Sequence, residues 1–148
     1  MALTVEQALD RIEIGDVLVQ YAVYMDAGEF DSLAGIFAED ATYDIVPDPG
    51  IVPVPARGRA AIRQILSDRY AEVSKTAQRR HLISTVVIDE LEADHARTRC
   101  FLTVLTAPKE GGAVELRGTG VYYDELARVG GGWRIARRRL VLDALKSS

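Results

Sequence analysis

The second half of the chain repeats a strand pattern four times, and this repetition limits the possible folds more than any other feature. Residues 79–89, 96–107, 114–127 and 133–142 are rich in apolar and β-branched residues. Short stretches of glycine and polar residues separate these segments. Strands joined by such short turns pair with their sequence neighbours, so we predict an antiparallel meander.

The first half has helical rather than strand periodicity. Thr4 and Gln7 have the spacing of a capping box, which predicts a helix that begins near Val5. Gly28 is well suited to end this helix. The apolar residues in between form two adjoining sets, so we expect the helix to be buried over much of its surface. One set is Leu9, Ile12, Val19 and Val23, and the other is Ile14, Val17, Leu18, Tyr21 and Met25.

Two further helices and one more strand complete the expected elements. We predict a short helix over residues 30–37, a strand over 41–46 and a helix over 59–75, with the proline-rich residues 47–55 as a loop. Helices that come first and strands that follow indicate the α+β class. The three N-terminal helices should pack on one face of a strongly curved, mainly antiparallel sheet. This arrangement is a cone with a pocket at its open end.

Composition narrows the functional classes. The chain has 148 residues, of which 48% are hydrophobic, and we expect a single domain over residues 1–148. The net charge of −4 offers no basic field for nucleic acid or an anionic membrane. Cys100 is the single cysteine, the N-terminus lacks a signal-peptide pattern, and no apolar run is long enough to span a membrane. We therefore expect a soluble cytoplasmic protein with neither nucleic acid nor membrane as partner.

Five short strings of residues follow one another along nearly the whole chain. They are Tyr21-Ala22 with Asp26, Gly28 and Phe30-Asp31; Leu33 with Ile36-Phe37 and Asp40-Ala41; Gly58-Arg59 with Ile62; Arg80-His81-Leu82-Ile83-Ser84; and Gly120, Tyr122 and Asp124 followed by Gly131-Gly132-Trp133-Arg134-Ile135. In their order and spacing these strings resemble those of SnoaL-like proteins, a group of the nuclear transport factor 2-like (NTF2-like) superfamily that includes scytalone dehydratase-type enzymes. The resemblance implies a cone-shaped α+β barrel with a pocket for a small apolar molecule.

The resemblance assigns roles to particular residues. In dehydratases of this kind, an aspartate late in the first helix pairs with a histidine on the strand after the third helix, which implies Asp26 and His81. Two family tyrosines hold a water on the substrate carbonyl; Tyr43 matches one, but Met25 occupies the position of the other. Residues 96–107 contain no match for a further pocket histidine. The resemblance therefore implies a dyad and one tyrosine rather than a complete scytalone dehydratase site.

The chemistry of these residue types suits proton transfer next to a carbonyl. Such a reaction needs a base and a hydrogen-bond donor for the oxygen on which negative charge develops. A histidine held by Asp26 through one ring nitrogen is an oriented acid or base, with Asp26 itself as the alternative base. Tyr43, together with Tyr21 or Tyr24, can donate to the oxygen without carrying a charge. No metal or organic cofactor is required, and two histidines at positions 81 and 95 lack metal-ligand spacing.

Three functions remain open at this point. The first is a cofactor-independent dehydratase, isomerase or cyclase that acts by general acid–base catalysis on a small apolar carbonyl compound, aromatic or polycyclic. The second is a non-catalytic protein of the same fold that binds a small apolar ligand. The third is a structural subunit similar to the small subunits of ring-hydroxylating dioxygenases. Asp26 and His81 together favour the first. The apolar outer face of the predicted sheet also favours a homodimer, with a homotrimer as the alternative.

Overall fold

The computed structural model describes residues 2–143 and contains three helices and one six-stranded sheet. The helices are α1 (Val5–Ala27), α2 (Phe30–Gly35) and α3 (Arg59–Val73). The strands are β1 (Phe37–Val46), β2 (Ala56–Arg57), β3 (Ala77–Leu91), β4 (His95–Pro108), β5 (Glu115–Val129) and β6 (Gly132–Leu142). The strand order in the sheet is β2-β1-β6-β5-β4-β3.

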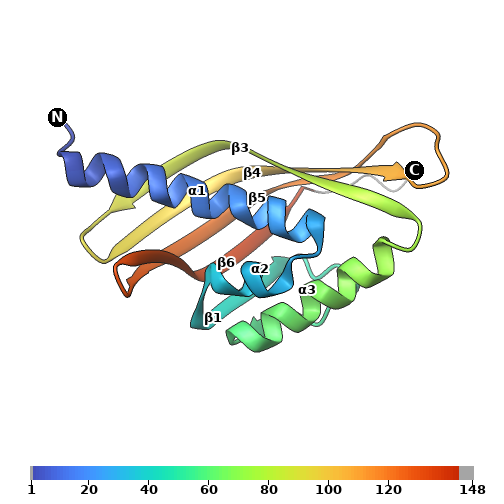
Figure 1. The fold of residues 1–148 in the computed structure, drawn as a ribbon, viewed down its shortest axis with the longest axis horizontal. Helices are drawn as coiled ribbons and strands as arrows, with labels where there is room; N and C mark the ends of the chain where they lie inside the picture. The colour runs from blue at the N-terminus through green and yellow to red at the C-terminus, as the bar shows by residue number, and fades with distance from the viewer. Residues whose placement is uncertain (1, 144–148) are drawn as a thin grey trace.

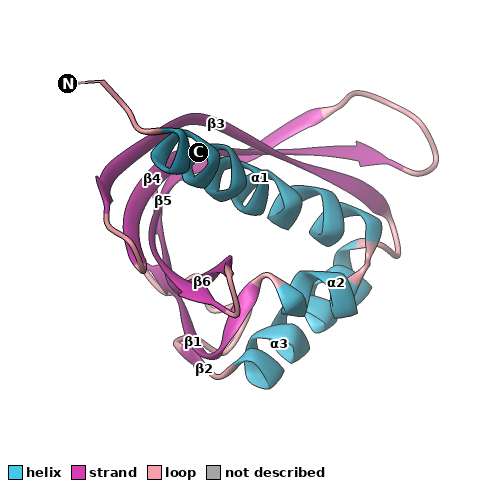
Figure 2. Cartoon of the chain, turned by 60° about the vertical axis from the view of Figure 1, so that its left-hand side comes forward, coloured by secondary structure: helices cyan, strands magenta, loops and turns pink. Residues whose placement is uncertain are grey.

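The helices cover the concave face of a sheet that curves strongly but does not close (Figures 1 and 2). The strands from β3 to β6 form the predicted antiparallel meander. The strands β1 and β6 are parallel, so the sheet is mixed. The α+β class with a curved, mainly antiparallel sheet is therefore confirmed. Within residues 2–143, no helix has both the length and the apolar character needed to cross a membrane.

Helix α1 begins and ends as the sequence predicts. The side chain of Thr4 accepts a hydrogen bond from the backbone of Gln7, and the side chain of Gln7 accepts one from the backbone of Thr4. Gly28 ends the helix with a φ of 73°, a left-handed conformation that glycine adopts without strain. A side chain at this position would also lie 2.9 Å from the ring of Tyr70.

The expectation that α1 is buried over much of its surface is wrong for one of the two apolar sets. Ile14, Leu18 and Tyr21 of the second set are fully buried against the sheet. The first set points outward: Leu9, Ile12, Val19 and Val23 are between 42% and 63% exposed. A helix on one face of a single sheet can bury only the side that meets the sheet, and no other described element covers the opposite side.

The boundaries lie within two residues of the sequence prediction except for the start of β1, and one strand was not predicted. The short helix ends at Gly35 rather than at residue 37, and β1 begins at Phe37 rather than at residue 41. The backbone N–H of Ile135 on β6 donates to the carbonyl of Ile36 at 2.8 Å, and this tertiary pairing draws the following residues into the sheet. The two-residue strand β2 was not predicted because its two residues are too few to show periodicity.

A polar cluster fixes the first half of α1 to the hairpin of β5 and β6. One carboxylate oxygen of the buried Asp10 accepts hydrogen bonds from the indole of Trp133 at 3.0 Å and from Arg128 at 2.7 Å. The hydrogen bond from Trp133 has the larger effect and that from Arg128 the next, and together they hold the pKa of Asp10 below its usual range. The cluster therefore sets the direction in which α1 crosses the sheet and carries its far end toward β3.

Candidate functional site

A cavity of about 650 Å³ lies between the helices and the concave face of the sheet. Apolar side chains from five segments form much of its wall, among them Met25, Ile45, Leu66, Leu102, Val104 and Leu140. Polar groups reach it from α1, β1, β3 and β5: Tyr21, Tyr43, His81 and Tyr122. A cavity of this size and lining suits a small, largely apolar organic molecule.

Asp26 and His81, the two residues that the resemblance pairs, are in direct contact. Asp26 lies at the end of α1, and its Oδ1 is 2.5 Å from Nδ1 of His81 on β3. Its second oxygen, Oδ2, accepts a hydrogen bond from the backbone N–H of the same histidine at 2.8 Å. The Asp26 side chain is 10% exposed and that of His81 is 7% exposed. One carboxylate therefore holds both the ring and the backbone of His81.

This contact determines which ring nitrogen of His81 is available to a ligand. An ionised carboxylate can only accept hydrogen bonds, so Nδ1 carries the hydrogen that points to Asp26. In a neutral ring, Nε2 then keeps its lone pair. His81 lines the main cavity, whereas Asp26 does not. The arrangement can therefore present an oriented imidazole base to a molecule in the cavity, with Asp26 behind it.

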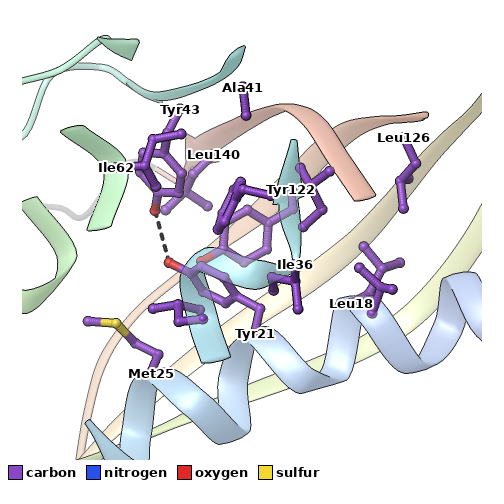
Figure 3. Packing of buried hydrophobic residues seen from close by; sticks show 14 of the residues in the cluster. Leu18, Tyr21, Met25, Ile36, Ala41, Tyr43, Ile62, Tyr122, Leu126 and Leu140 are labelled. Carbon is purple, nitrogen blue, oxygen red and sulfur yellow. Dashed lines mark hydrogen bonds between the residues drawn. The ribbon is translucent and has the colours of Figure 1, made fainter. Parts of the chain in front are cut away.

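Three tyrosines from three elements meet beside the dyad. The hydroxyl oxygens of Tyr21 on α1 and Tyr43 on β1 are 3.3 Å apart (Figure 3). The ring of Tyr21 also lies edge-to-face with the rings of His81, at 6.3 Å, and of Tyr122 on β5, at 5.7 Å. Tyr21, Tyr43 and Tyr122 all line the cavity. Tyr24 is not brought into this group; it is half-buried and packs against the core away from the cavity.

The cavity tyrosines are suited to donate hydrogen bonds as neutral phenols. Burial raises the pKa of Tyr43 and that of Tyr122 well above the usual range, and the nearby Tyr21 adds to both shifts. The buried charge of Arg138 acts in the opposite direction on each. Both hydroxyls therefore stay protonated at ordinary pH, as a donor to a carbonyl oxygen must.

Arg138 is a buried cation directly behind two of these tyrosines. Its guanidinium lies 3.8 Å from the ring centroid of Tyr122 and 4.3 Å from that of Tyr21. It donates to both oxygens of Asp124, from Nε at 2.8 Å and from Nη2 at 2.9 Å, and neither side chain is exposed. Burial opposes the charged form, but the charge and hydrogen bonds of Asp124 outweigh it and raise the pKa of Arg138.

Sequence reasoning missed both Tyr122 and Arg138. A run of three arginines such as 137–139 is typical of a solvated face or a rim of salt bridges, but its central member is fully buried. Side chains alternate along a strand, so Arg137 and Arg139 face outward while Arg138 points into the protein. The same alternation turns Tyr122 and Asp124 inward, and an inward acid opposite an inward arginine was the signal available in the sequence.

Cys100 and Asp16 do not join this site. Cys100 is buried, and burial raises the pKa of its thiol to about 11, so it is a poor nucleophile at neutral pH. Asp16 is exposed on the outer side of α1. Residues 2–143 hold no group of three or more histidine, cysteine and acidic side chains with the arrangement of a metal site.

The chain is similar to several known proteins over most of its length. The family model of the SnoaL-like domain matches residues 6–139. The uncharacterised protein Rv2910c of Mycobacterium tuberculosis is 31% identical over 140 residues, which cover 92% of this chain and 87% of that protein. The solved structure of Rv3472 from Mycobacterium tuberculosis, of unknown function, is 29% identical, has a TM-score of 0.80 and covers 95% of this chain and 76% of its own. An NTF2-like protein with a cystatin-like fold from Novosphingobium aromaticivorans is 25% identical, with a TM-score of 0.80 and coverages of 95% and 85%.

Proposed function

The chain belongs to the SnoaL-like domain family of the NTF2-like superfamily, as the sequence strings indicated, and from this premise we propose that it is a cofactor-independent enzyme. The proposed activity is that of a dehydratase, isomerase or cyclase that moves a proton next to a carbonyl group. The observation that carries the proposal is the 2.5 Å contact between Asp26 and His81 beside the cavity tyrosines. The mostly apolar wall supports an aromatic or polycyclic carbonyl compound as substrate.

In the proposed reaction, His81 is the base and Asp26 orients it. Nε2 of His81 takes a proton from the carbon next to the carbonyl, and the electrons of the broken C–H bond form the C=C bond of an enolate. The negative charge that develops on the oxygen is stabilised by hydrogen bonds from Tyr43 and Tyr122. The protonated His81 then gives its proton to another carbon or to a departing hydroxyl group, which completes an isomerisation or a dehydration.

The geometry favours His81 over Asp26 as the base. Both oxygens of Asp26 are already engaged, one with the ring and one with the backbone N–H of His81. Asp26 is also absent from the lining of the main cavity, which His81 reaches. A base must lie within hydrogen-bonding distance of the proton that it removes, directly or through one water. Asp26 meets this condition only through His81.

We expect the protein to accelerate exchange of the protons next to the carbonyl of an aromatic ketone such as 1-tetralone, and Asp26→Asn to slow that exchange about 100-fold or more. An asparagine can donate from its amide to Nδ1 of His81, which moves the hydrogen to Nε2 and removes the lone pair that accepts the proton. The measurement is proton NMR of the ketone in deuterated water.

Asp16→Asn is the matched control for this experiment. It is the same chemical change on the same helix, but Asp16 is exposed and lies outside the cavity. We expect it to leave the exchange rate unchanged. A wild-type protein that exchanges the ketone no faster than buffer would contradict the enzymatic proposal and would favour a non-catalytic binding protein.

We propose a homodimer formed through the convex face of the sheet. This face carries large apolar side chains that are exposed in one copy of the chain, including Leu82 at 44%, Phe101 at 49% and Tyr123 at 48%. Leu82, Phe101 and Tyr123 come from β3, β4 and β5, which are adjacent in the sheet. Apolar patches of this kind mark interaction surfaces in proteins of this size.

Phe101→Glu is expected to convert the dimer to a monomer, because it places a charge in the apolar interface. The measurement is the molar mass by light scattering after size-exclusion chromatography. Val23→Glu, which introduces the same charge on the exposed side of α1, should leave the mass unchanged. A wild-type mass of three chains would favour a homotrimer instead, and a wild-type monomer would contradict the proposal.

A further inference from the structure

Three arginines line the same cavity as His81, and two of them, Arg69 and Arg79, lie close enough for their charges to interact. Arg69 comes from α3 and Arg79 from β3, and both line the cavity. Arg79 is two residues before His81 on the same strand, so their side chains leave the same face of the sheet, and their backbone positions are about 7 Å apart. Glu72 and Arg117 also line the cavity and act on Arg69, so this part of the wall is charged while much of the rest is apolar.

Neither cation has an acidic side chain in direct contact within the described chain, although Glu72 acts on Arg69 at longer range. Nε of Arg69 and Nη2 of Arg79 are buried and form no hydrogen bond within residues 2–143. The ion pairs among these residues include neither arginine. Burial and then the nearby charge of Arg79 lower the pKa of Arg69, as is expected for a cation placed beside another cation.

The acidic side chains that line the cavity with the two arginines make their closest polar contacts with other residues. Glu115 pairs with Arg117 at 2.9 Å, and Glu72 pairs with Lys75 at 2.9 Å. Asp143 accepts a hydrogen bond from the hydroxyl of Thr119 at 2.7 Å. A buried N–H donor without a partner costs free energy, and a charged one costs more. A ligand with anionic oxygens would supply the missing acceptors.

We propose that Arg69 and Arg79 form a subsite for an oxyanion group, a carboxylate or a phosphate, on the molecule that occupies the cavity. The inference rests on the proposed function, because it takes the cavity to be the substrate site. It narrows the substrate to an apolar carbonyl compound with one acidic group, held by its acid at the arginines and by its carbonyl at the tyrosines. The planar guanidinium fork can donate two parallel hydrogen bonds to such a group.

The acidic group would determine how the substrate enters. The whole chain has a net charge of −4, which repels anions at a distance, so the attraction must come from these two local cations. The short spacing of Arg79 and His81 along β3 requires the acid and the reacting carbon to belong to one compact molecule. An acid bound at the arginines would thereby fix which carbon lies next to Nε2 of His81.

The test compares three probes with the same ring system: 2-naphthylacetic acid, 2-naphthyl phosphate and the uncharged 2-naphthylacetamide. We expect the wild-type protein to bind at least one of the two anions about tenfold or more tightly than the amide in isothermal titration calorimetry. The ratio of the dissociation constants of the two anions shows whether the subsite prefers a carboxylate or a phosphate. Equal binding of all three probes, or no measurable binding of either anion, would overturn the proposal.

Arg79→Gln should abolish the preference for the anion and leave the affinity for the amide unchanged. Arg80→Gln is the matched control, because Arg80 is the exposed neighbour on the same strand and its replacement changes the net charge equally. Arg79→Lys keeps the positive charge and should retain part of the preference. This result would show that the loss in Arg79→Gln comes from the missing charge and not from a folding defect. An unchanged preference in Arg79→Gln and in Arg69→Gln would overturn the subsite. The binding preference is measured without turnover, so the two proposals can be tested separately. Loss of the preference with ketone exchange intact would contradict only the subsite, and absence of exchange with the preference intact would contradict only the enzymatic activity.

Discussion

Replacing His81 with alanine is expected to abolish the acceleration of ketone proton exchange while the protein stays folded. The imidazole is the one group of the dyad that lines the cavity, and a positioned base contributes about 10²–10⁴ to the rate of such a reaction. Oδ2 of Asp26 keeps its hydrogen bond from the backbone N–H of residue 81, which does not depend on the side chain. The measurements are NMR exchange rates and thermal unfolding of both proteins.

Two controls separate a catalytic His81 from a structural one. His95→Ala removes the other histidine, which begins β4 and does not line the cavity, and it should leave the rate unchanged. Imidazole added to the His81→Ala protein should restore part of the rate, because it can enter the space that the side chain leaves. A His81→Ala protein that is folded and fully active would show that another group removes the proton. Loss of folding would instead assign His81 to the core.

The second large effect concerns stability rather than rate. Arg138→Leu is expected to destabilise the fold by about 3–5 kcal/mol, because it leaves the carboxylate of Asp124 buried without its partner. In a domain of this length that loss lowers the melting temperature by on the order of 10 °C. Thermal and urea unfolding followed by circular dichroism provide the measurement. Arg139→Leu is the control, since Arg139 is exposed on the same strand and its loss should cost little.

A double variant distinguishes the buried charge from simple packing. When Arg138→Leu and Asp124→Leu are combined, no uncompensated charge remains, and the protein should be more stable than either single variant. A double variant less stable than both single variants would contradict this explanation. If the double variant folds, its exchange rate is informative as well, because the tyrosines then lack the cation that lies 3.8 Å from the ring centroid of Tyr122.

Periodicity in the sequence predicts most of the helices and strands and the meander of β3 to β6, but not the pairing of β1 with β2 and β6. The cap at Thr4, the end at Gly28 and the four long strands depend on local residues, and they appear where they were predicted. The start of β1 at Phe37 and the strand β2 depend on contacts with distant segments. Local residue preferences carry no information about such contacts, so these elements could not be read from the chain alone.

The sequence likewise predicted some residues of the candidate site and not others. Asp26 and His81 were found because family strings surround both, although the assignment of their catalytic role stays a prediction. Tyr122 was missed because an inward tyrosine on a strand resembles any core residue in sequence. Arg138 was missed because an arginine between two others indicates a solvated surface until the alternation of the strand is combined with the buried Asp124 on its neighbour.

The parallel pairing of β1 with β6 bears on the order in which the site is assembled during synthesis. Tyr43 lies opposite Arg138 in this pairing, so residues separated by most of the chain must meet before the tyrosines and their cation are together. A ribosome that has not yet released residues 132–142 holds a chain whose first strand lacks its main partner. Contacts at such long sequence separation form slowly, because the intervening loop must close first. Activity should therefore appear only after the last strand has docked, which makes turnover a sensitive reporter of complete folding.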